Sequence, residues 1–499
     1  MRFVSFFVDG KNRIAPEPLA PRHHHSISTS FYNLHNVDPP PLNEGYSFNT
    51  TLQAELAGKL LLLDELSLSL NEVHDHYDHG YIRYNKGIDN EQGKWKCNRC
   101  GNNEPRLFAS FSCYRCKEMQ CVYCRNCIMM GRVSQCTPLV SWIGPSLNWK
   151  DRNCESVWEG MLSSAQENAS LRLEEKIGVK DELLIWAVCG AGKTEVLFQG
   201  IEKALKTGQR VCIATPRTDV VLELLPRLRK VFPGVTLSGL YGGSMDHMDG
   251  AQLILSTTHQ LFRFRKAFDL IIVDEVDAFP FSYDKTLAYA VQQAQKAEAL
   301  IVYLSATPDR KMKQRAEDGK LPSVKIPKRY HGFPLPVPHF LWCGHWKKKL
   351  KKNKLPGNVM NWINHQLERN RQGFLFVPSV RTLEQIVPLL KEMNPLIEGV
   401  HAEDPDRKEK VIRFRNGETP ILVTTTILER GVTVPFTDVA VLGTEEEIFT
   451  ESALVQIAGR AGRSKDDPAG EVLFYHYGKT TAMVQAKRHI EQMNREAGL

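Results

Sequence analysis

One stretch of the chain, LLIWAVCGAGKTEVL at residues 183–197, has the composition of a phosphate-binding loop. An apolar run ends in a glycine-containing turn, and Lys193 and Thr194 then open a helical pattern. The backbone N–H groups of such a turn and the N-terminus of the following helix point at one place and attract anions. Lys193 can reach the β- and γ-phosphates of a nucleotide, and the Thr194 hydroxyl can bind Mg²⁺. We therefore predict that ATP and Mg²⁺ bind at Ala187, Val188, Cys189, Gly190, Ala191, Gly192, Lys193 and Thr194.

The loop departs from the strict pattern GxxxxGK[ST] at its first position, where Ala187 replaces glycine. Gly190 and Gly192 remain, and they permit the close backbone approach to phosphate that a Cβ atom would block. An ordinary glycine turn before a helix is the alternative interpretation, so the prediction needs a second part of the same site.

A pair of carboxylates supplies that second part. The run LIIVDEVDAF (270–279) places Asp274 and Glu275 at the end of another apolar stretch. Ligands of an open parallel sheet gather at the carboxyl ends of its strands, so we expect this pair beside the loop. Asp274 would complete the Mg²⁺ coordination, and Glu275 would orient and deprotonate the attacking water. An acidic strand end that faces solvent is the alternative, and the occurrence of both parts in order argues against it.

Seven cysteines lie between Cys97 and Cys127, most of them in CxxC pairs, and Cys136 follows. Zinc takes four thiolates in a tetrahedron, and one CxxC turn supplies two of them. In a large chain without a recognisable secretion signal, this spacing indicates metal binding rather than a disulfide framework. Cys97 and Cys100 belong to every scheme, the other two ligands stay open, and with Cys136 the cysteines suffice for two sites of four thiolates each. Reduced cysteines or redox switches are the alternative.

These residues need a large scaffold. The chain has 499 residues, 42% of them hydrophobic, and a formal net charge of +7. This size allows two or three domains, and the mildly basic charge suits a polyanionic partner. No apolar run reaches the roughly 18 residues of a membrane span, and the start of the chain lacks a secretory signal, so we expect a cytoplasmic protein.

Compact apolar runs bounded by polar turns occur in two series, and a proline-rich break, IPKRYHGFPLPVPH (326–339), separates the series. Such runs indicate strands that helices cover on both faces, as in parallel sheets. We predict an α/β fold with two tandem parallel-sheet domains behind a small cysteine-rich zinc module. The predicted parts are an irregular N-terminal region (1–95), the zinc-binding module (96–137), the ATP-binding domain (138–325), a linker (326–340) and the C-terminal domain (341–499).

Five further motifs follow the loop: TPR (215–217), STTHQ (256–260), SAT (305–307), TTTILERGVTVP (424–435) and QIAGRAGR (456–463). The order and residue types of these motifs resemble those of the superfamily 2 helicases and translocases over residues of about 160 to 480. The resemblance implies two tandem RecA-like domains with the nucleotide between them. It also implies that Gln166 binds the adenine and that Gln456, Arg460 and Arg463 act on the nucleotide from the second domain, where the arginines stabilise transition-state charge.

The same resemblance implies further contacts. Gly431 and Thr433 would lie at the nucleotide, and a nucleic-acid backbone would contact Arg217, Thr257, Thr258 and Thr425. Contacts to backbone phosphates carry no sequence information, so we expect binding that is independent of sequence and sensitive to salt.

The complete set of motifs, taken with the cysteine module, resembles one family within this superfamily. A cysteine module precedes WEGMLSSAQENAS (158–170), WAVCGAGKTE (186–195) and VDEVDAFP (273–280). This combination resembles the ComFA family, the ATPases of natural competence in Gram-positive bacteria, over nearly everything after residue 80. The resemblance implies an ATPase, stimulated by single-stranded DNA, that pulls one incoming strand through the membrane channel ComEC, with ComFC and DprA as associates. It implies a position on the cytoplasmic face of the membrane as a peripheral protein and leaves a homo-oligomer open.

The ComFA resemblance also bears on the zinc ligands. YCRNCIMMGR (123–132) is similar to the second half of that family's zinc module, which favours Cys124 and Cys127 as partners of Cys97 and Cys100. Cys113, Cys116 and Cys121 then form a rival set or part of a second site.

Two other functions remain as alternatives. A replication-restart or repair helicase of the PriA type also combines cysteines with superfamily 2 motifs, but its family is longer and carries its cysteines within the second motor domain. A non-catalytic, zinc-containing DNA-binding adaptor with a decayed nucleotide site belongs to another class. The intact set of Lys193, Asp274, Glu275, Arg460 and Arg463 argues against the adaptor.

Overall fold

The computed structural model describes residues 1–8, 11–21, 27–35, 37–149, 153–244, 250–430 and 434–499. The chain forms two compact units. The first contains Met1–Glu159, Leu173–Leu183 and Phe198–Tyr303, and the second contains Gly160–Arg172, Leu184–Leu197 and Leu304–Leu499.

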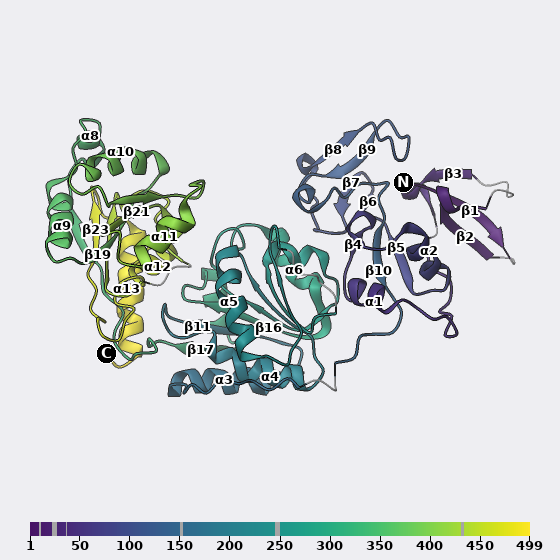
Figure 1. Cartoon of the computed structure of the whole chain (residues 1–499), viewed down its shortest axis with the longest axis horizontal. Helices are drawn as coiled ribbons and strands as arrows, with labels where there is room; N and C mark the ends of the chain where they lie inside the picture. The colour runs from purple at the N-terminus through teal and green to yellow at the C-terminus, as the bar shows by residue number, and fades with distance from the viewer. Residues whose placement is uncertain (9–10, 22–26, 36, 150–152, 245–249, 431–433) are drawn as a thin grey trace. The chain divides into compact units, whose positions relative to one another are not determined.

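The N-terminal residues form two small sheets, and the prediction of an irregular region was wrong. Strand β1 pairs antiparallel with β2 and β3, and β10 pairs antiparallel with β4 and β5 (Figure 1). Aromatic and aliphatic side chains of these strands and of helices α1 and α2, including Phe3, Phe31 and Tyr84, form one buried core. Prolines mark the turns, but the apolar residues between them suffice for a core. The elements are β1 (Arg2–Val8), β2 (Lys11–Pro16), β3 (Ile27–Ser30), α1 (Thr50–Leu56), β4 (Leu61–Leu62), α2 (Leu70–Asp78), β5 (Ile82–Asn85) and β10 (Leu139–Trp142).

The cysteine-rich residues are an insertion in this N-terminal fold. They form two antiparallel hairpins, β6–β7 and β8–β9, between β5 and β10. Because β10 returns to pair with β4 and β5, the N-terminal sheet extends past the predicted boundary at residue 138. The hairpin strands are β6 (Ile88–Glu91), β7 (Lys94–Cys97), β8 (Phe108–Phe111) and β9 (Cys121–Cys124).

A seven-stranded sheet follows, with strand order β13-β14-β12-β15-β16-β11-β17. The strand pairs with a described register are parallel. Strands β12 and β14 are buried at every position, which explains their continuous apolar sequences. The elements are α3 (Ser164–Lys176), β11 (Asp181–Ala187), α4 (Phe198–Lys206), β12 (Val211–Thr215), α5 (Thr218–Val231), β13 (Leu237–Leu240), β14 (Leu253–Thr257), β15 (Phe268–Val273), α6 (Lys285–Ala294), β16 (Gln295–Ser305), α7 (Arg310–Glu317) and β17 (Ser323–Ile326).

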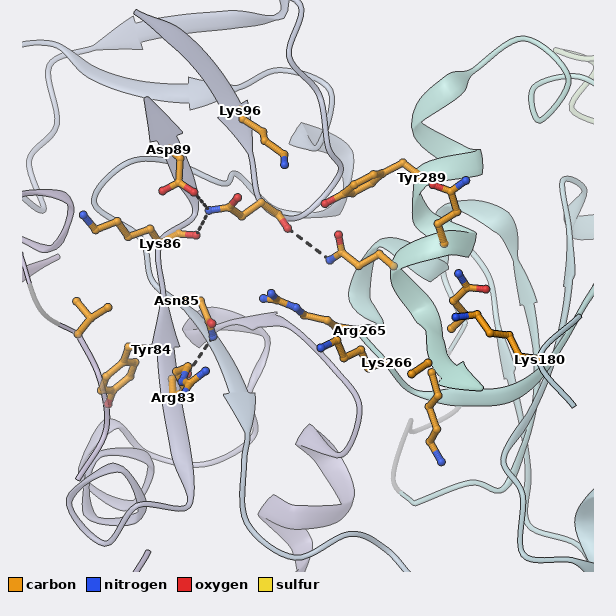
Figure 2. Close-up of a pocket in the computed structure, with 17 residues that line it drawn as sticks. Arg83, Tyr84, Asn85, Lys86, Asp89, Lys96, Lys180, Arg265, Lys266 and Tyr289 are labelled. Carbon is orange, nitrogen blue, oxygen red and sulfur yellow. Dashed lines mark hydrogen bonds between the residues drawn. The ribbon is translucent and has the colours of Figure 1, made fainter. Parts of the chain in front are cut away.

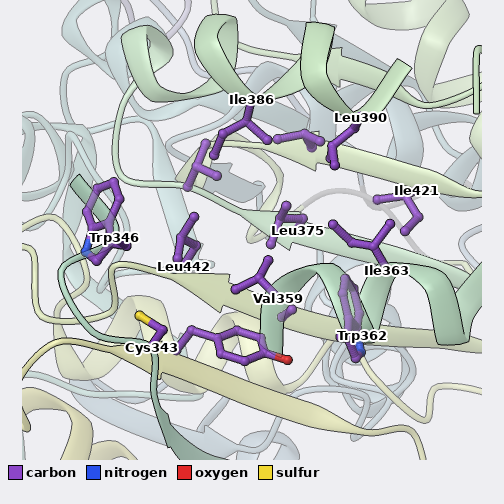
Figure 3. Close-up of a cluster of buried hydrophobic side chains, with 14 of the residues drawn as sticks. Cys343, Trp346, Val359, Trp362, Ile363, Leu375, Ile386, Leu390, Ile421 and Leu442 are labelled. Atoms are coloured by element: carbon purple, nitrogen blue, oxygen red, sulfur yellow. The ribbon is translucent and has the colours of Figure 1, made fainter. Parts of the chain in front are cut away.

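The C-terminal domain has a second parallel sheet, in the order β18-β23-β22-β19-β21-β20. Side chains from α9 and α10, such as Ile363, Ile386 and Leu390, converge on Leu375 and Leu442 of the strands in one buried cluster (Figure 3). The elements are β18 (His339–Trp342), α8 (Trp346–Leu350), α9 (Gly357–Glu368), β19 (Gln372–Phe376), α10 (Val380–Lys391), β20 (Glu398–Val400), α11 (Arg407–Arg415), β21 (Ile421–Thr424), β22 (Thr437–Leu442), α12 (Glu451–Ala458), β23 (Val472–His476) and α13 (Thr481–Glu496).

The two parallel sheets behind a cysteine-rich module confirm the predicted fold class. Residues 327–338, between β17 and β18, contain no helix or strand and include most of the proline-rich break.

Candidate ATPase site and metal centres

The predicted phosphate loop lies in the second unit, directly after β11. Gly190 and Gly192 have φ angles of 79° and 67°, a region that side-chain-bearing residues rarely adopt. Lys193 and Thr194 are half-buried at the turn that leads into η6 (Glu195–Leu197) and α4. In the described part of the chain, the Lys193 ammonium has no hydrogen-bond or ion-pair partner. The loop therefore has the backbone freedom and the available cation that phosphate binding requires.

Gln166 on α3 contacts this loop from the side. Its Nε2 donates to the carbonyl oxygens of Ala191 and Gly192, at 2.8 and 3.3 Å, and its Oε1 accepts from the backbone N–H of Ser163 at 2.8 Å. A Cβ atom on Gly192 would lie only 2.6 Å from that Nε2. The glutamine thus supports the shape of the loop, and the positive φ angle of Gly192 together with this contact favours glycine at 192.

The helix α12 carries Gln456, which also contacts the loop. The Cys189 thiol donates to Oε1 of Gln456 at 3.0 Å, and both side chains are buried. A Cβ atom on Gly459 would lie 2.5 Å from Cβ of Cys189, so only glycine fits there. Nε2 of Gln456 is buried and has no hydrogen-bond partner in the described part of the chain. An unpaired buried donor beside a phosphate loop suits an oxygen of a bound nucleotide.

The predicted arginines follow α12, and each is held by a backbone carbonyl. Nε of Arg460 donates to the carbonyl of Glu429 at 2.8 Å, and Nε of Arg463 donates to the carbonyl of Gly459 at 2.9 Å. Arg460 is buried and Arg463 half-buried. The predicted nucleotide residues Gly431 and Thr433 lie outside the described residues.

Arg329 is a further residue at this place, and the sequence did not point to it. It is buried, its Nη2 donates to the carbonyl of Ala461 at 2.9 Å, and its Nη1 donates to the carbonyl of Gly462. The next residue, Tyr330, donates its backbone N–H to the carbonyl of Gly190 at 3.0 Å. Burial lowers the pKa of Arg329 to about 10, and the nearby charge of Arg463 acts in the same direction. The inter-domain segment therefore connects the phosphate loop to the arginine-bearing turn.

The predicted acidic pair lies in the first unit, at the end of β15. Oδ1 of Asp274 accepts a 2.8 Å hydrogen bond from the backbone N–H of Glu275, whose φ angle is 53°. Glu275 thus has a left-handed backbone conformation, which is uncommon for a residue with a side chain and occurs often at functional sites.

The residues proposed to contact nucleic acid lie at strand ends. Arg217 precedes α5 and pairs with Asp219 at 3.3 Å. Thr257 ends β14, Thr258 follows it, and both are buried, whereas Thr425 follows β21 and is half-buried. The buried Oγ1 of Thr258 has no partner in the described part of the chain.

The cysteines form two groups in the first unit. Cys97, Cys100, Cys124 and Cys127 make one group and Cys113, Cys116, Cys121 and Cys136 make the other, with the sulfur atoms of each group within 4.8 Å of one another. All eight side chains are buried, and all are free cysteines. Four thiols at this separation match the ligand set of a structural zinc ion.

The two groups separate at Cys121 and Cys124, which share a CxxC motif in the sequence. These residues are the first and last of strand β9, and side chains three positions apart on a strand point to opposite faces. The motif is therefore not a metal-binding turn, and its two cysteines belong to different groups. The sequence spacing alone could not distinguish this arrangement from a CxxC turn whose two cysteines bind the same ion.

The thiols of the first group also interact with one another. Hydrogen bonds from Cys100, Cys127 and Cys97 lower the pKa of Cys124, and Nδ2 of Asn102 donates to its sulfur at 3.5 Å. In the second group, a hydrogen bond from Cys121 lowers the pKa of Cys136 to about 3. Contacts within each group therefore lower the pKa of at least one sulfur, which favours the thiolate form that binds metal.

A buried ion-pair network connects the first group to the rest of the unit. Arg99, in the turn between Cys97 and Cys100, is fully buried and pairs with both carboxylate oxygens of Glu65, at 2.9 and 3.0 Å. Glu65 ends η3 (Leu63–Glu65) and also accepts from Nε of Arg263 at 2.7 Å. One carboxylate thus joins the cysteine module, the N-terminal fold and the motor domain.

Comparisons with known proteins identify these parts. Family models match the Competence protein ComFA N-terminal domain at residues 43–141, the res subunit of type III restriction enzymes at 159–310 and the helicase conserved C-terminal domain at 354–465. Competence protein ComFA of Bacillus subtilis is 52% identical over 455 residues, which cover 91% of this chain and 97% of that protein. The chain belongs to the ComFA family. ComFA of Streptococcus pneumoniae is 37% identical, over 82% of this chain and 92% of that protein.

Solved helicase structures share the fold of this ComFA-family chain. Yeast (S. cerevisiae) Dbp5 bound to RNA and ADP BeF3 matches with a TM-score of 0.50 and 16% identity, over 66% of this chain and 87% of that chain. Mycobacterium smegmatis helicase Lhr bound to ssDNA and AMP-PNP matches with a TM-score of 0.51 and 18% identity, over 68% and 48%. At these identities the likeness shows the fold alone, which is that of two RecA-like helicase domains.

Family membership and the two helicase domains make this chain an ATPase of the superfamily 2 type, with an ATP-dependent, DNA-helicase-like role in competence. The predictions of ATP binding, DNA binding and membership of ComFA are confirmed at this level. In the described part of the chain, no helix is both long enough and apolar enough to cross a membrane.

Proposed function

We propose that this chain is an ATP-driven translocase of single-stranded DNA that drives the uptake of transforming DNA across the cytoplasmic membrane. The observation that most directly supports this proposal is the hydrogen bond between Cys189 of the phosphate loop and Gln456 of α12. It joins nucleotide motifs of the two RecA-like domains, and an ATP-driven motor needs groups of both domains at one nucleotide.

The residues have separate roles in this proposal. The loop N–H groups and Lys193 hold the phosphates, and Thr194 with Asp274 holds Mg²⁺, which neutralises charge on the phosphate oxygens. Glu275 accepts the proton of the attacking water on its carboxylate. Gln456 donates its unpaired Nε2 to a phosphate oxygen. Gly190 and Gly192 fit this use, because their positive φ angles favour glycine and a residue without Cβ lets the backbone approach the phosphates closely.

Arg460 and Arg463 couple hydrolysis to movement in this proposal. Their guanidinium groups stabilise the charge that develops during phosphoryl transfer, which draws the second RecA-like domain towards the nucleotide. Release of the products removes this attraction, and the domains separate again. A strand held by Arg217, Thr257 and Thr258 of one domain and Thr425 of the other would advance with each cycle, because these contacts lie on parts that move relative to one another.

We further propose that the cysteines bind two zinc ions. Cys97, Cys100, Cys124 and Cys127 would hold one ion, and Cys113, Cys116, Cys121 and Cys136 the other. Zinc supplies four strong bonds to hairpins that have few other buried side chains, so its role here is to stabilise the module.

The partners follow from the family. We propose that the chain works as a peripheral protein at the cytoplasmic face of the membrane, where it delivers force to a strand that passes through ComEC, with ComFC and DprA as associates.

One set of assays tests the motor. ATP hydrolysis is measured at fixed salt with single-stranded DNA, duplex DNA and RNA, and translocation is measured by displacement of streptavidin from a biotinylated single strand. We expect strong stimulation by single-stranded DNA, ATP-dependent displacement, and loss of both in Lys193→Ala with strand binding retained. Lys206, an exposed lysine of the next helix, gives the matched control Lys206→Ala. Hydrolysis that single strands do not stimulate, or stimulation by forked duplex alone, would contradict the proposal.

A further inference from the structure

A cleft in the first unit collects basic side chains that the motor proposal does not use. It is a cavity of about 700 Å³, with the N-terminal fold and the β6–β7 hairpin on one side and the first RecA-like domain on the other (Figure 2). We call it the cationic cleft. The basic residues that line it are Arg83, Lys86, Lys96, Lys180, Arg265, Lys266 and Lys296.

The charge of the cationic cleft is largely unbalanced. Of its basic residues, only Lys296 has an ion pair with a described carboxylate, that of Asp269 at 2.8 Å. Asp89 is the single acidic residue in the lining, and its Oδ2 accepts from Nδ2 of Asn98 at 2.8 Å rather than from a cation. Like charges that face one another across a concave surface raise the local potential and attract anions.

The walls of the cleft are fixed relative to one another within the unit. The backbone N–H of Arg265 donates to the carbonyl of Gly58 at 2.9 Å, and that of Leu60 donates to the carbonyl of Arg263 at 2.7 Å. A fully buried arginine, Arg210, reaches from the motor domain to the carbonyl of Ala57 at 2.8 Å. The backbone segments that carry the cations are therefore in place before any ligand arrives, so binding need order only the side chains.

The cysteine module forms the upper wall of the same cleft. The ring of Tyr289 on α6 packs so closely on Gly101 that a Cβ atom there would lie 2.6 Å from it. Nε2 of Gln293 also donates to the carbonyl of Asn98 at 3.4 Å. The position of Lys96 over the cleft thus depends on the fold of the first cysteine group (Figure 2).

Neutral groups in the cleft favour a nucleic acid over a simple anion. Tyr289 is half-buried and offers a ring face, and Gln292 offers an amide donor and acceptor. The Nδ2 of Asn85 and the Nε2 of Gln293 already donate within the unit, so these residues offer their amide oxygens. A second hollow, of about 390 Å³, shares Arg83 and Arg265 and continues the surface past Trp142. Basic side chains that alternate with aromatic rings along a groove are typical of proteins that bind single strands.

We propose that the cationic cleft is a second binding site for single-stranded nucleic acid, separate from the strand-end residues of the motor domains. Lys96, Arg83 and Arg265 contact the phosphates, and Tyr289 stacks on a base. The site holds the strand on the N-terminal side of the motor, so a strand released by one set of contacts during the ATP cycle stays bound by the other. Strand binding at this site does not require the proposed translocase activity.

The test compares two triple variants of the full chain. The first is Arg83→Ala, Lys96→Ala, Arg265→Ala, and the control is Lys94→Ala, Arg125→Ala, Lys230→Ala, three exposed cations of the same unit that do not line the cleft. Binding of fluorescein-labelled oligodeoxythymidylate is followed by anisotropy over a range of KCl concentrations. Each phosphate contact with a single strand contributes about −0.7 to the slope of log K against log salt concentration. The slope for the cleft variant, which lacks the contacts of all its substituted residues, should therefore be smaller in magnitude by about 2, and its binding at low salt about 10-fold weaker. The control should keep the slope and affinity of the unchanged protein, and both variants should keep ATP hydrolysis without DNA.

A second measurement locates the strand directly. An oligonucleotide that contains 5-iododeoxyuridine is crosslinked to the unchanged protein by ultraviolet light, and the modified peptide is identified by mass spectrometry. We expect crosslinks at Tyr289. Equal salt slopes for the two triple variants, together with no crosslink in the cleft, would overturn the proposal. So would a cleft variant that binds DNA normally but no longer sediments with phosphatidylglycerol vesicles, because the cleft would then bind a membrane surface.

Discussion

Cys189 and Gln456 are 267 residues apart in the chain, and the thiol of one donates a 3.0 Å hydrogen bond to the side-chain carbonyl of the other. A thiol is a weak donor, so the bond itself contributes little free energy. Its effect is geometric, because an amide whose Oε1 is held at Cys189 must turn its Nε2 the other way. That Nε2 is buried without a partner in the described part of the chain, which is the orientation expected if Gln456 contacts the nucleotide as we propose.

Gln456→Ala should therefore lower kcat for ATP hydrolysis by about 10²-fold, the effect of losing one preorganised donor at a phosphate oxygen. Cys189→Ala removes only the weak thiol donor, and hydrolysis should stay within about twofold of the original value. Steady-state hydrolysis with saturating single-stranded DNA measures both. If the two changes have equal effects, Gln456 acts through packing on the loop rather than through its amide.

Arg329 should matter through its two hydrogen bonds to the arginine-bearing turn. Arg329→Ala leaves the carbonyls of Ala461 and Gly462 without their charged donor, which costs roughly 1.5 to 3 kcal/mol for a charge-assisted hydrogen bond. Arg329→Lys keeps the charge but loses the planar fork, and it should rescue stability more than activity. The free energy of unfolding and kcat are measured side by side, with the exposed neighbour Lys328→Ala as control. Full activity in Arg329→Lys would mean that only the charge is needed.

Glu275→Gln should bind ATP and fail to hydrolyse it. The amide keeps the size of the side chain and cannot accept the proton of the attacking water, so turnover should fall by about 10² to 10⁴-fold. Binding is measured with a fluorescent ATP analogue and turnover by phosphate release. Asp277→Asn, a nearby half-buried carboxylate two positions along the chain, serves as control and should hydrolyse ATP normally. Normal turnover in Glu275→Gln would exclude Glu275 as the base.

The sequence predicted those parts of the molecule whose residue types are set by neighbours in the chain, such as buried strands and the phosphate loop. The strand VCIAT is apolar at nearly every position because both faces of β12 are buried, and the phosphate loop needs glycine, lysine and threonine at fixed spacing. Arg329 could not be predicted in this way. Its hydrogen-bond partners lie 132 and 133 residues further along the chain, and the residues around it have the composition of a proline-rich linker. The N-terminal sheet was missed for a similar reason, since β5 finds its partner β10 only after the cysteine hairpins.

The two groups of four cysteines predict how many zinc ions the protein binds. The purified chain should contain two zinc ions, and Cys97→Ser or Cys113→Ser should each remove one of them, because the two changes affect different groups of four ligands. Cys212→Ser is the matched control, since this cysteine is buried in β12 and belongs to neither group. Metal content is measured by mass spectrometry of the desalted protein. Loss of both ions from a single change would mean that the groups do not fold independently, and one ion in the unchanged protein would contradict the second site.

Glu65 offers the sharpest stability prediction, because one carboxylate neutralises two arginines. Arg99 is fully buried and Arg263 is 19% exposed, so Glu65→Gln leaves the Arg99 guanidinium without a counter-charge away from water and weakens the partly solvated contact with Arg263. Removing one partner of a buried pair costs about 3 to 5 kcal/mol, and we expect a loss of this size in the free energy of unfolding of the first unit. Glu104 pairs with Arg106 at 3.1 Å in an exposed position, so Glu104→Gln should cost less than about 1 kcal/mol. Chemical denaturation followed by tryptophan fluorescence compares the two. If both variants lose little free energy of unfolding, Arg99 and Arg263 find other acceptors. The ion pair between Arg99 and Glu65 would then not be what holds the cysteine module against the motor domain.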